Sequence, residues 1–193
     1  MKTMGYLASW VAAFVFSLSL LSCGEAQNEY TSYTAYFLFY NATHQNFVLS
    51  SAMNINAPGT FCKVKLSVRS GVTYFDFENN QGQTESSVAL APDMNATRIL
   101  GYNNALIVGF GNLDIPAVFY AFDGECPNCF DPKALPVRSR PLTMTGAGLA
   151  VCATCHREYN MNSGGNVVSG DGGNKLTRYH ATCTGPFGRL AVN

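Results

Sequence analysis

Hydrophobic and polar positions alternate along much of the chain, with the period of two that is typical of half-buried β-strands. Val64, Leu66 and Val68 alternate with Lys63, Lys65, Ser67 and Arg69, so a strand here has one apolar face and one polar face. Ser70-Gly71 interrupts this pattern, and residues 72–77 form a second run of β-branched and aromatic side chains. The two runs predict a pair of strands joined by a tight turn.

Similar short runs recur through the rest of the chain, separated by glycine pairs and by clusters of asparagine and glycine. They predict further strands in residues 33–40, 105–110, 117–122, 149–151, 166–169, 176–181 and 189–192. No stretch after residue 29 has a helical period, and the pattern of residues 87–100 assigns no element. Many short strands with turn signals favour an all-β fold, an antiparallel sandwich or barrel. Residues 33–193 are expected to form it as a single domain.

The composition argues against a disordered chain and against a nucleic-acid-binding protein. Charged residues make up only 12% of the 193 positions and apolar residues 47%, a balance that does not occur in disordered chains. The formal net charge is zero, and no cluster of lysine and arginine is present that would bind a phosphate backbone. Nucleic acid is therefore not an expected partner.

The first residues predict an export signal. Lys2 precedes an apolar run at residues 7–21, which is too short to span a bilayer securely. The run ends at Leu20-Leu21-Ser22-Cys23, which resembles a bacterial lipobox. We therefore predict a signal peptide at residues 1–22, acylation of Cys23 and a linker at 23–32. An ordinary secretory signal is the alternative, and both place the body of the protein outside the cytoplasm.

The predicted lipoprotein is anchored to a bacterial membrane, and the sequence does not distinguish the inner from the outer membrane. No Arg-Arg pair precedes the apolar run, so the signal is of the general secretory kind and not the twin-arginine kind. Such a chain crosses the membrane unfolded and without a preloaded cofactor.

Four cysteines carry the strongest chemical signal. They form two C-x-x-C pairs, Cys126/Cys129 and Cys152/Cys155, with 22 residues between the pairs. Two intervening residues allow a tight turn to present both thiolates to one ion, and two such turns complete a tetrahedron, as in zinc ribbons. The spacing therefore predicts a metal site made of these four side chains.

Disulfides are the main alternative, because even-numbered cysteines outside the cytoplasm are normally oxidised. A bond closed within one C-x-x-C is strained, however, and two such pairs are uncommon in structural disulfides. A redox-active dithiol is a third interpretation. Cys62 and Cys183 have no neighbouring cysteine, and we expect them to form a disulfide or to be two inert buried thiols.

The sequence around these cysteines resembles Rieske-type iron–sulfur domains. The run Val118-Phe119-Tyr120-Ala121-Phe122-Asp123-Gly124-Glu125-Cys126-Pro127 is similar to the aromatic strand, acidic turn and Cys-Pro of the first cluster loop. The run Cys152-Ala153-Thr154-Cys155-His156-Arg157-Glu158-Tyr159 resembles the second loop, and Gly165, Gly170 and Leu176-Thr177-Arg178-Tyr179 resemble the turns and strand that follow. The resemblance implies a Rieske-like antiparallel β-sandwich or barrel with a small rubredoxin-like, zinc-ribbon-like metal subdomain. It places cluster-type loops at residues 123–132 and 150–160.

The ligand set differs from that family. A Rieske centre uses two cysteines and two histidines, and by position Cys126 and Cys152 match the cysteines. Asn128 and Cys155 occupy the two positions at which that family has histidines. His156 follows the second of these positions by one residue, and we expect it to be at most an auxiliary residue of the site. An all-thiolate set suits zinc, a single rubredoxin-like iron or a four-cysteine 2Fe-2S cluster. Export in an unfolded state favours zinc, or an empty oxidised site, over a cluster.

The sequence thus predicts a membrane-anchored, Rieske-like protein that binds a metal through Cys126, Cys129, Cys152 and Cys155. Electron transfer is the role that the resemblance implies. The alternatives are a non-redox binding or scaffold lipoprotein, with the cysteines as a zinc site or disulfides, and a thiol–disulfide enzyme. Catalysis by the chain itself is not expected. The lipid anchor makes the membrane a partner, and the sequence identifies no redox or surface protein partner.

Overall fold

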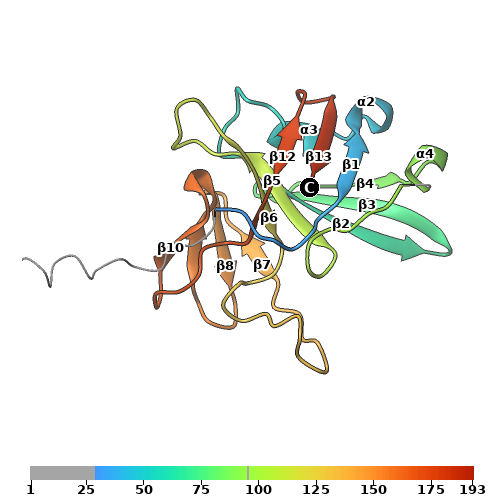
Figure 1. Cartoon of the computed structure of the whole chain (residues 1–193). Coiled ribbons are helices and arrows are strands. Elements are labelled where there is room, and N and C mark those ends of the chain that lie inside the picture. Colours follow the sequence, from blue (N-terminus) through green and yellow to red (C-terminus); the bar gives the residue numbers. More distant parts are fainter. Residues whose placement is uncertain (1–28, 95) are drawn as a thin grey trace, which may run out of the picture.

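Residues 29–94 and 96–193 are described by a computed structural model of the chain (Figure 1). The predicted signal peptide and Cys23 lie outside this part. The largest sheet has six antiparallel strands in the order β11-β6-β5-β2-β3-β4. Its strands are β2 (Phe61–Arg69), β3 (Val72–Asn79), β4 (Thr84–Val88), β5 (Ala105–Phe110), β6 (Phe119–Asp123) and β11 (Arg178–Tyr179).

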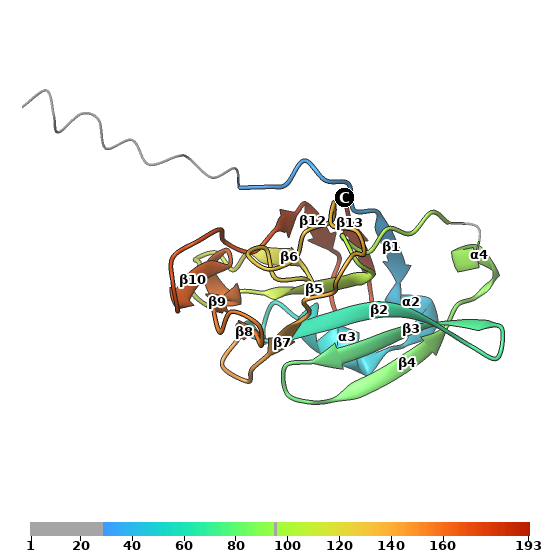
Figure 2. The ribbon, with the colours of Figure 1, turned by 90° about the horizontal axis from the view of Figure 1, so that it is seen from below.

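Two smaller antiparallel sheets accompany it, with the orders β1-β13-β12 and β10-β9-β8-β7. Figure 2 shows the second of these at one end of the molecule. The first contains β1 (Phe37–Tyr40), β12 (Ala181–Cys183) and β13 (Arg189–Val192). The second contains β7 (Leu142–Met144), β8 (Leu149–Cys152), β9 (Glu158–Asn160) and β10 (Asn166–Ser169). The helices are α2 (Asn41–His44), α3 (Phe47–Ala52), α4 (Ala91–Met94) and a 3-10 turn, η2 (Met161–Ser163).

Strands at the centre of the large sheet are buried on both faces. All six residues of β5 are buried, and its side chains alternate between two hydrophobic clusters. Leu106 and Val108 belong to a cluster shared with α3 and the β1-β13-β12 sheet, whereas Ile107 belongs to a cluster shared with β7, β8 and β9. The small sheets are therefore the two covers of one central layer. We call the β7–β10 unit, which carries Cys152, the small subdomain.

The predicted all-β fold is confirmed, and strands form within every predicted stretch. The prediction of one strand at residues 176–181 was wrong, because the chain changes sheets at His180. β11 before it pairs with β6, and β12 after it pairs with β13. β4, β7 and β9 carried no alternation clear enough to predict them.

Lys63 is a second correction. Alternation placed it on a polar face, but the small subdomain covers that part of the sheet. The lysine is 7% exposed, and its ammonium donates a hydrogen bond to the carbonyl of Leu142 at 2.7 Å. Burial lowers its pKa. Val68, at the far end of the same strand, is 69% exposed because the strand extends past the core there.

The expectation of no helix after residue 29 was also wrong. α3 is six residues long, which is too short for a helical period to be recognised. Its N-terminus is held by two side chains: the Asn46 carboxamide accepts a hydrogen bond from the N–H of Leu49 (2.8 Å), and the Glu85 carboxylate accepts from the N–H of Phe47 (2.8 Å) and Val48 (3.2 Å). In the part of the chain that the structure describes, no helix has the length and apolar character to cross a membrane.

We expect Asn46→Ala to lower the free energy of unfolding by about 1–2 kcal/mol, because it removes the cap of a buried helix. Asn46 is fully buried, and its amide also donates to the hydroxyl of Ser87 at 3.1 Å. Asn166→Ala is the matched control, since Asn166 is exposed and spans only a local turn. It should change the stability by less than about 0.5 kcal/mol. Equal urea midpoints for the two variants would show that the cap contributes nothing.

Candidate metal centre

One C-x-x-C pair lies in the loop between β6 and β7, and the other lies at the end of β8, in the small subdomain. Cys126 follows the end of β6, and its carbonyl accepts hydrogen bonds from the N–H groups of Cys129 (3.2 Å) and Phe130 (2.9 Å). Cys152 ends β8, and its carbonyl accepts from the N–H of His156 at 2.9 Å. Each pair is thus wrapped on a tight turn, as the spacing predicts, so both sulfurs of a pair point to the same side.

The four sulfur atoms lie close to one point. All of them are within 4.8 Å of one another. The Cys126 and Cys155 sulfurs are 3.8 Å apart, and those of Cys129 and Cys152 are 3.9 Å apart. Four sulfurs at about 2.3 Å from a tetrahedral ion are about 3.8 Å from each other. The arrangement therefore has the size of a mononuclear tetrathiolate site.

The same distances disfavour the other interpretations. A disulfide needs sulfurs about 2.05 Å apart, and all four cysteines are free thiols. In a four-cysteine 2Fe-2S cluster each iron holds two sulfurs, and the cluster core separates the two pairs by more than about 5 Å. No pair here is separated by more than 4.8 Å. The geometry fits one ion better than a binuclear cluster.

Burial differs between the first and second cysteine of each pair. Cys126 and Cys152 are buried in the cluster beneath the central sheet, whereas Cys129 and Cys155 are half-buried. Desolvation raises the pKa of Cys126 and of Cys129. Desolvation also opposes ionisation of Cys155, but hydrogen bonds from the backbone and side chain of Arg157 outweigh it and lower the pKa of this thiol to about 6. A cation shared by the four sulfurs would offset the cost of ionising the others.

Tyr159 and Asn128 form a polar layer against the sulfurs. The Tyr159 hydroxyl lies 3.2 Å from the Cys126 sulfur, and the Asn128 amide donates a hydrogen bond to the hydroxyl oxygen at 2.9 Å. The hydroxyl hydrogen is thereby left to point at the sulfur. Burial raises the pKa of Tyr159, so it remains a neutral donor.

Asn128 also holds the chain that passes beside the site. Its amide donates to the carbonyl of Asn174 (2.8 Å), and its carbonyl oxygen accepts from the N–H of Asn174 (2.9 Å). A Cβ on Gly173 would lie 2.5 Å from this oxygen, so a larger residue there would push the Asn128 side chain out of these contacts. The Asn128 side chain is therefore engaged in hydrogen bonds within the protein, and it is not one of the residues of the sulfur group.

Arg157 links the second loop to the turn after β10. Its guanidinium donates to the carbonyls of Asp171 (2.9 Å) and Gly172 (3.1 Å), in addition to its contact with Cys155. A tetrathiolate site with a divalent ion carries two negative charges, and the arginine supplies a cation at its exposed edge. Sequence reasoning gave no role to Arg157 or to the Tyr159 hydroxyl. The positions of both after the second pair were the only signal.

Two buried carboxylates fix the first loop to the central sheet. Asp123 is 1% exposed and accepts hydrogen bonds from the Tyr179 hydroxyl (2.7 Å) and from the backbone of Tyr102 (2.7 Å) and Glu125 (2.8 Å). Burial raises its pKa. Glu125 is 4% exposed and accepts from the side chains of Asn103 (2.7 Å) and Ser139 (2.6 Å) and from the N–H of Arg140. These bonds hold both sides of the loop that carries Cys126.

The remaining predicted residues lie elsewhere. His156 is exposed, has a φ of 57°, and no nitrogen of its ring joins the group of sulfur atoms. Cys62 and Cys183 are free thiols, the first buried and the second half-buried, at the hydrophobic cluster on the other face of the central sheet. Desolvation raises the pKa of both. Cys23 is outside the described residues.

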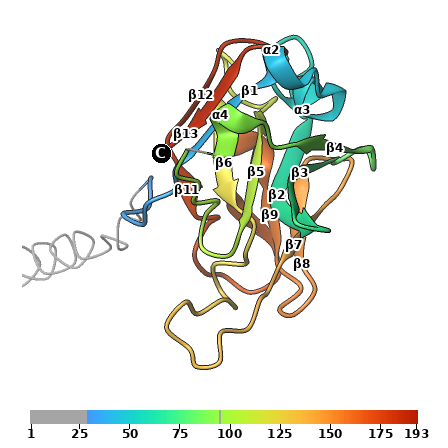
Figure 3. The same ribbon diagram turned by 90° about the vertical axis from the view of Figure 1, so that its right-hand side faces the viewer.

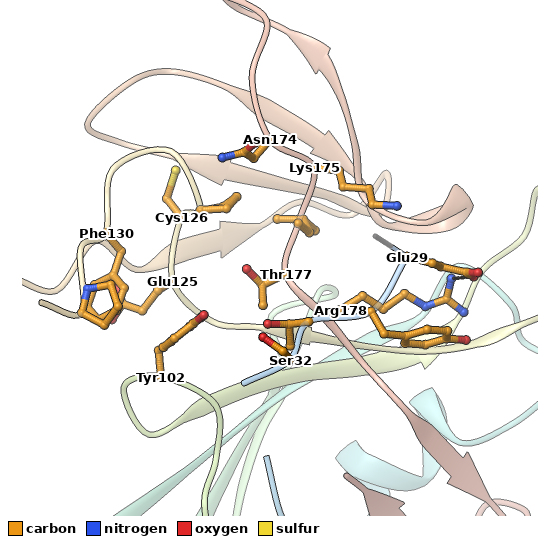
Figure 4. A pocket seen from close by; sticks show the side chains of 15 residues that line it. Glu29, Ser32, Tyr102, Glu125, Cys126, Phe130, Asn174, Lys175, Thr177 and Arg178 are labelled. Carbon is orange, nitrogen blue, oxygen red and sulfur yellow. Dashed lines mark hydrogen bonds and ion pairs between the residues drawn. The ribbon is translucent and has the colours of Figure 1, made fainter. Parts of the chain in front are cut away.

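A cleft of about 480 Å³ opens beside Cys126. Figure 4 shows Cys126 and Phe130 at one end of it and Glu29 with Arg178 at the other. Residues 29–32, part of the predicted linker, form a section of its wall. Most of its charged side chains are already paired within the protein, including Glu125 and Arg178.

Comparisons with protein-family models, with curated proteins and with solved structures each find no match to this chain. The site is therefore interpreted from its own geometry.

We expect replacement of any one of the four cysteines by serine to weaken metal binding about 100-fold. Structural zinc sites with four ligands bind with about 10–16 kcal/mol, so one ligand accounts for about 3 kcal/mol. Cys183→Ala is the matched control and should retain one metal per chain, since this cysteine lies outside the site. Metal content and competition with a chromophoric chelator measure both. A cysteine variant that binds as tightly as the control would contradict the four-ligand site.

We expect Tyr159→Phe to weaken metal binding about 10- to 100-fold, because it removes the hydrogen bond that orients the Cys126 sulfur. Tyr120→Phe is the control: its ring packs in the same cluster, but its hydroxyl donates to Asp114 at 2.5 Å. Its affinity should stay within a factor of about three of the parent, because no ligand is touched. Equal losses in both variants would assign the effect to packing and not to the sulfur contact.

Proposed function

We propose that this chain is an exported, Rieske-like lipoprotein that binds a single tetrahedral metal ion through Cys126, Cys129, Cys152 and Cys155, with zinc as its resident ion. The observation that carries the proposal is the spacing of the four sulfurs, all within 4.8 Å of one another. The all-thiolate set suits zinc. The export signal supports it as well, because zinc can be acquired after the unfolded chain has crossed the membrane.

The proposed role of the ion is to hold the small subdomain together. β7, β9 and β10 contain three or four residues each, and short strands of this kind are marginal without further support. The ion would join the loop after β6 to the loop after β8. It would also stabilise the hydrogen bonds of Asn128 with Tyr159 and Asn174, which join the first cysteine loop to β9 and to the segment after β10. The Rieske resemblance rests on the two cysteine loops and on the presence of a separate small sheet around them.

Electron transfer by a mononuclear iron is the second candidate. One observation favours it: Cys129 and Cys155 are half-buried, so one edge of the site reaches the surface where an electron could enter. An iron held by four cysteines is redox-active, whereas zinc is not. The nature of the resident metal therefore decides between a structural and a redox function.

We expect protein purified anaerobically to be colourless and to contain one zinc per chain. Removal of the zinc with a chelator under reducing conditions should lower the melting temperature, because binding stabilises only the folded chain. Lowering the pH should release the ion as well, since protons compete for the thiolates. Cys126→Ser, which should bind zinc about 100-fold more weakly, should lose its zinc at a lower chelator concentration than the parent protein.

Iron reconstitution separates the remaining outcomes. One iron per chain without labile sulfide, together with a high-spin ferric signal in electron paramagnetic resonance, agrees with the mononuclear site. One iron in protein as isolated would favour electron transfer over the structural role. Two irons with two sulfides per chain would contradict the mononuclear geometry.

A further inference from the structure

The start of the described chain is fixed to the molecule close to the metal centre. The Glu29 carboxylate pairs with the Arg178 guanidinium at 2.5 Å, and the N–H of Thr31 donates to the carbonyl of Arg178 at 3.0 Å. The Tyr30 ring stacks on His180 with 3.7 Å between centroids. These contacts leave Glu29 at one end of the cleft that Cys126 also lines. A chain that leads to this point is therefore attached to the metal-bearing side of the protein.

The proposed lipid anchor is close to this attachment point in sequence. Five residues, 24–28, separate Cys23 from Glu29. Fully extended, the chain from Cys23 to Glu29 spans at most about 20 Å. If Cys23 is acylated, as the proposed function requires, Glu29 and the adjoining cleft are held within that distance of the membrane surface.

The opposite end of the cleft leads into an exposed loop, residues 131–140. Phe130 and Pro132 line the cleft, and the loop beyond them extends away from the sheets (gold in Figure 3). Leu135 at its tip is 95% exposed and Val137 is 49% exposed. Two exposed cations, Lys133 and Arg138, flank these residues. An apolar tip between basic side chains has the composition that binds the interface of an anionic bilayer.

The base of this loop is rigid although its tip is exposed. Glu125 holds the hydroxyl of Ser139 and the N–H of Arg140, and Asp131 accepts from the N–H of Lys133 at 2.8 Å. Binding of the loop to a surface would therefore fix the orientation of the β6–β7 region from which it extends. A single exposed leucine is common on protein surfaces. Here, however, exposed apolar and basic residues occur together, on the loop that adjoins the cleft to which the N-terminal segment is attached.

We infer that loop 131–140 is a second membrane contact, which docks on anionic lipid headgroups and turns the metal-bearing end of the protein toward the bilayer. The lipid anchor restrains one end of the cleft and the loop restrains the other. The two restraints together define which face points to the membrane, whereas the anchor alone would allow the protein to rotate about Glu29.

The only tryptophan of the sequence, Trp10, lies in the predicted signal peptide. The mature protein would therefore contain no tryptophan, and a single introduced one can report on its surroundings. Leu135→Trp places a single fluorescent probe on the loop. Ile115→Trp is the matched control: Ile115 is also fully exposed, on the loop of residues 111–118 at the opposite end of the molecule (Figure 1). Each acylated variant is reconstituted in vesicles of phosphatidylglycerol and phosphatidylcholine, with and without brominated acyl chains.

We expect brominated lipid to quench the probe at 135 at least about threefold more than the probe at 115, with a blue-shifted emission only at 135. Replacing Lys133 and Arg138 by serine in the Leu135→Trp chain should reduce the preference for anionic over neutral vesicles about fivefold or more. Zinc content confirms that each variant keeps its metal site.

Each result has a defined meaning. Equal quenching of the two probes, or quenching of neither, in protein whose mass includes the acyl chains would overturn the orientation and leave the anchor and the metal site in place. A probe at 135 that stays in water would leave the loop to face a protein partner instead. A mass without acyl chains would overturn the anchor and the orientation together, while metal analysis still tests the proposed site by itself.

Discussion

Burial of the central strands on both faces is the constraint on which the structure depends. β5 and β6 alternate large side chains to two sides, and each fully buried aliphatic or aromatic side chain contributes about 1.5–3 kcal/mol. Neither face of this sheet can be left to water. The β1-β13-β12 sheet with α3 covers one face, and the small subdomain covers the other. The small subdomain, which carries Cys152, is thus part of the hydrophobic core and not an appendage to it.

The same constraint explains why the site is well defined. Tyr159 and Cys152 are packed into the cluster that also contains Ile107 and Phe122 of the central sheet. Asp123, at the end of β6, is held by Tyr179 of the neighbouring strand β11. At Gly124 the chain passes so close to β5 that a Cβ would lie 2.3 Å from the Cβ of Ala105. The first loop therefore begins at a fixed position, and so does the second.

Local sequence pattern predicted the fold class and the grouping of the four cysteines, because both depend on short-range features: alternation over a few residues and the two-residue spacing of each cysteine pair. The sequence pattern did not predict features that depend on contacts between residues far apart in the chain. Lys63 reads as a surface residue until Leu142 is placed over it, and α3 exists because Asn46 and Glu85 complete its N-terminus. The contacts of Asn128 with Asn174, 46 residues away, could not be read from the sequence. Nor could the sequence alone choose between a single ion, a binuclear cluster and disulfides, since that choice rests on the distances between sulfurs.

The contacts of Asn128 limit which side chains can replace it. A histidine at position 128 would give up the bonds to the Asn174 backbone and to the Tyr159 hydroxyl, which lies against the Cys126 sulfur. Gly173, whose backbone is accommodated only because it carries no side chain, would face a bulkier ring. Exchange at Cys155 would in turn leave Arg157 without the thiolate it contacts. A new side chain at position 128 or 155 would therefore need a compensating substitution in a second segment of the chain. Epistasis of this kind constrains both positions, although neither segment is next to the other in sequence.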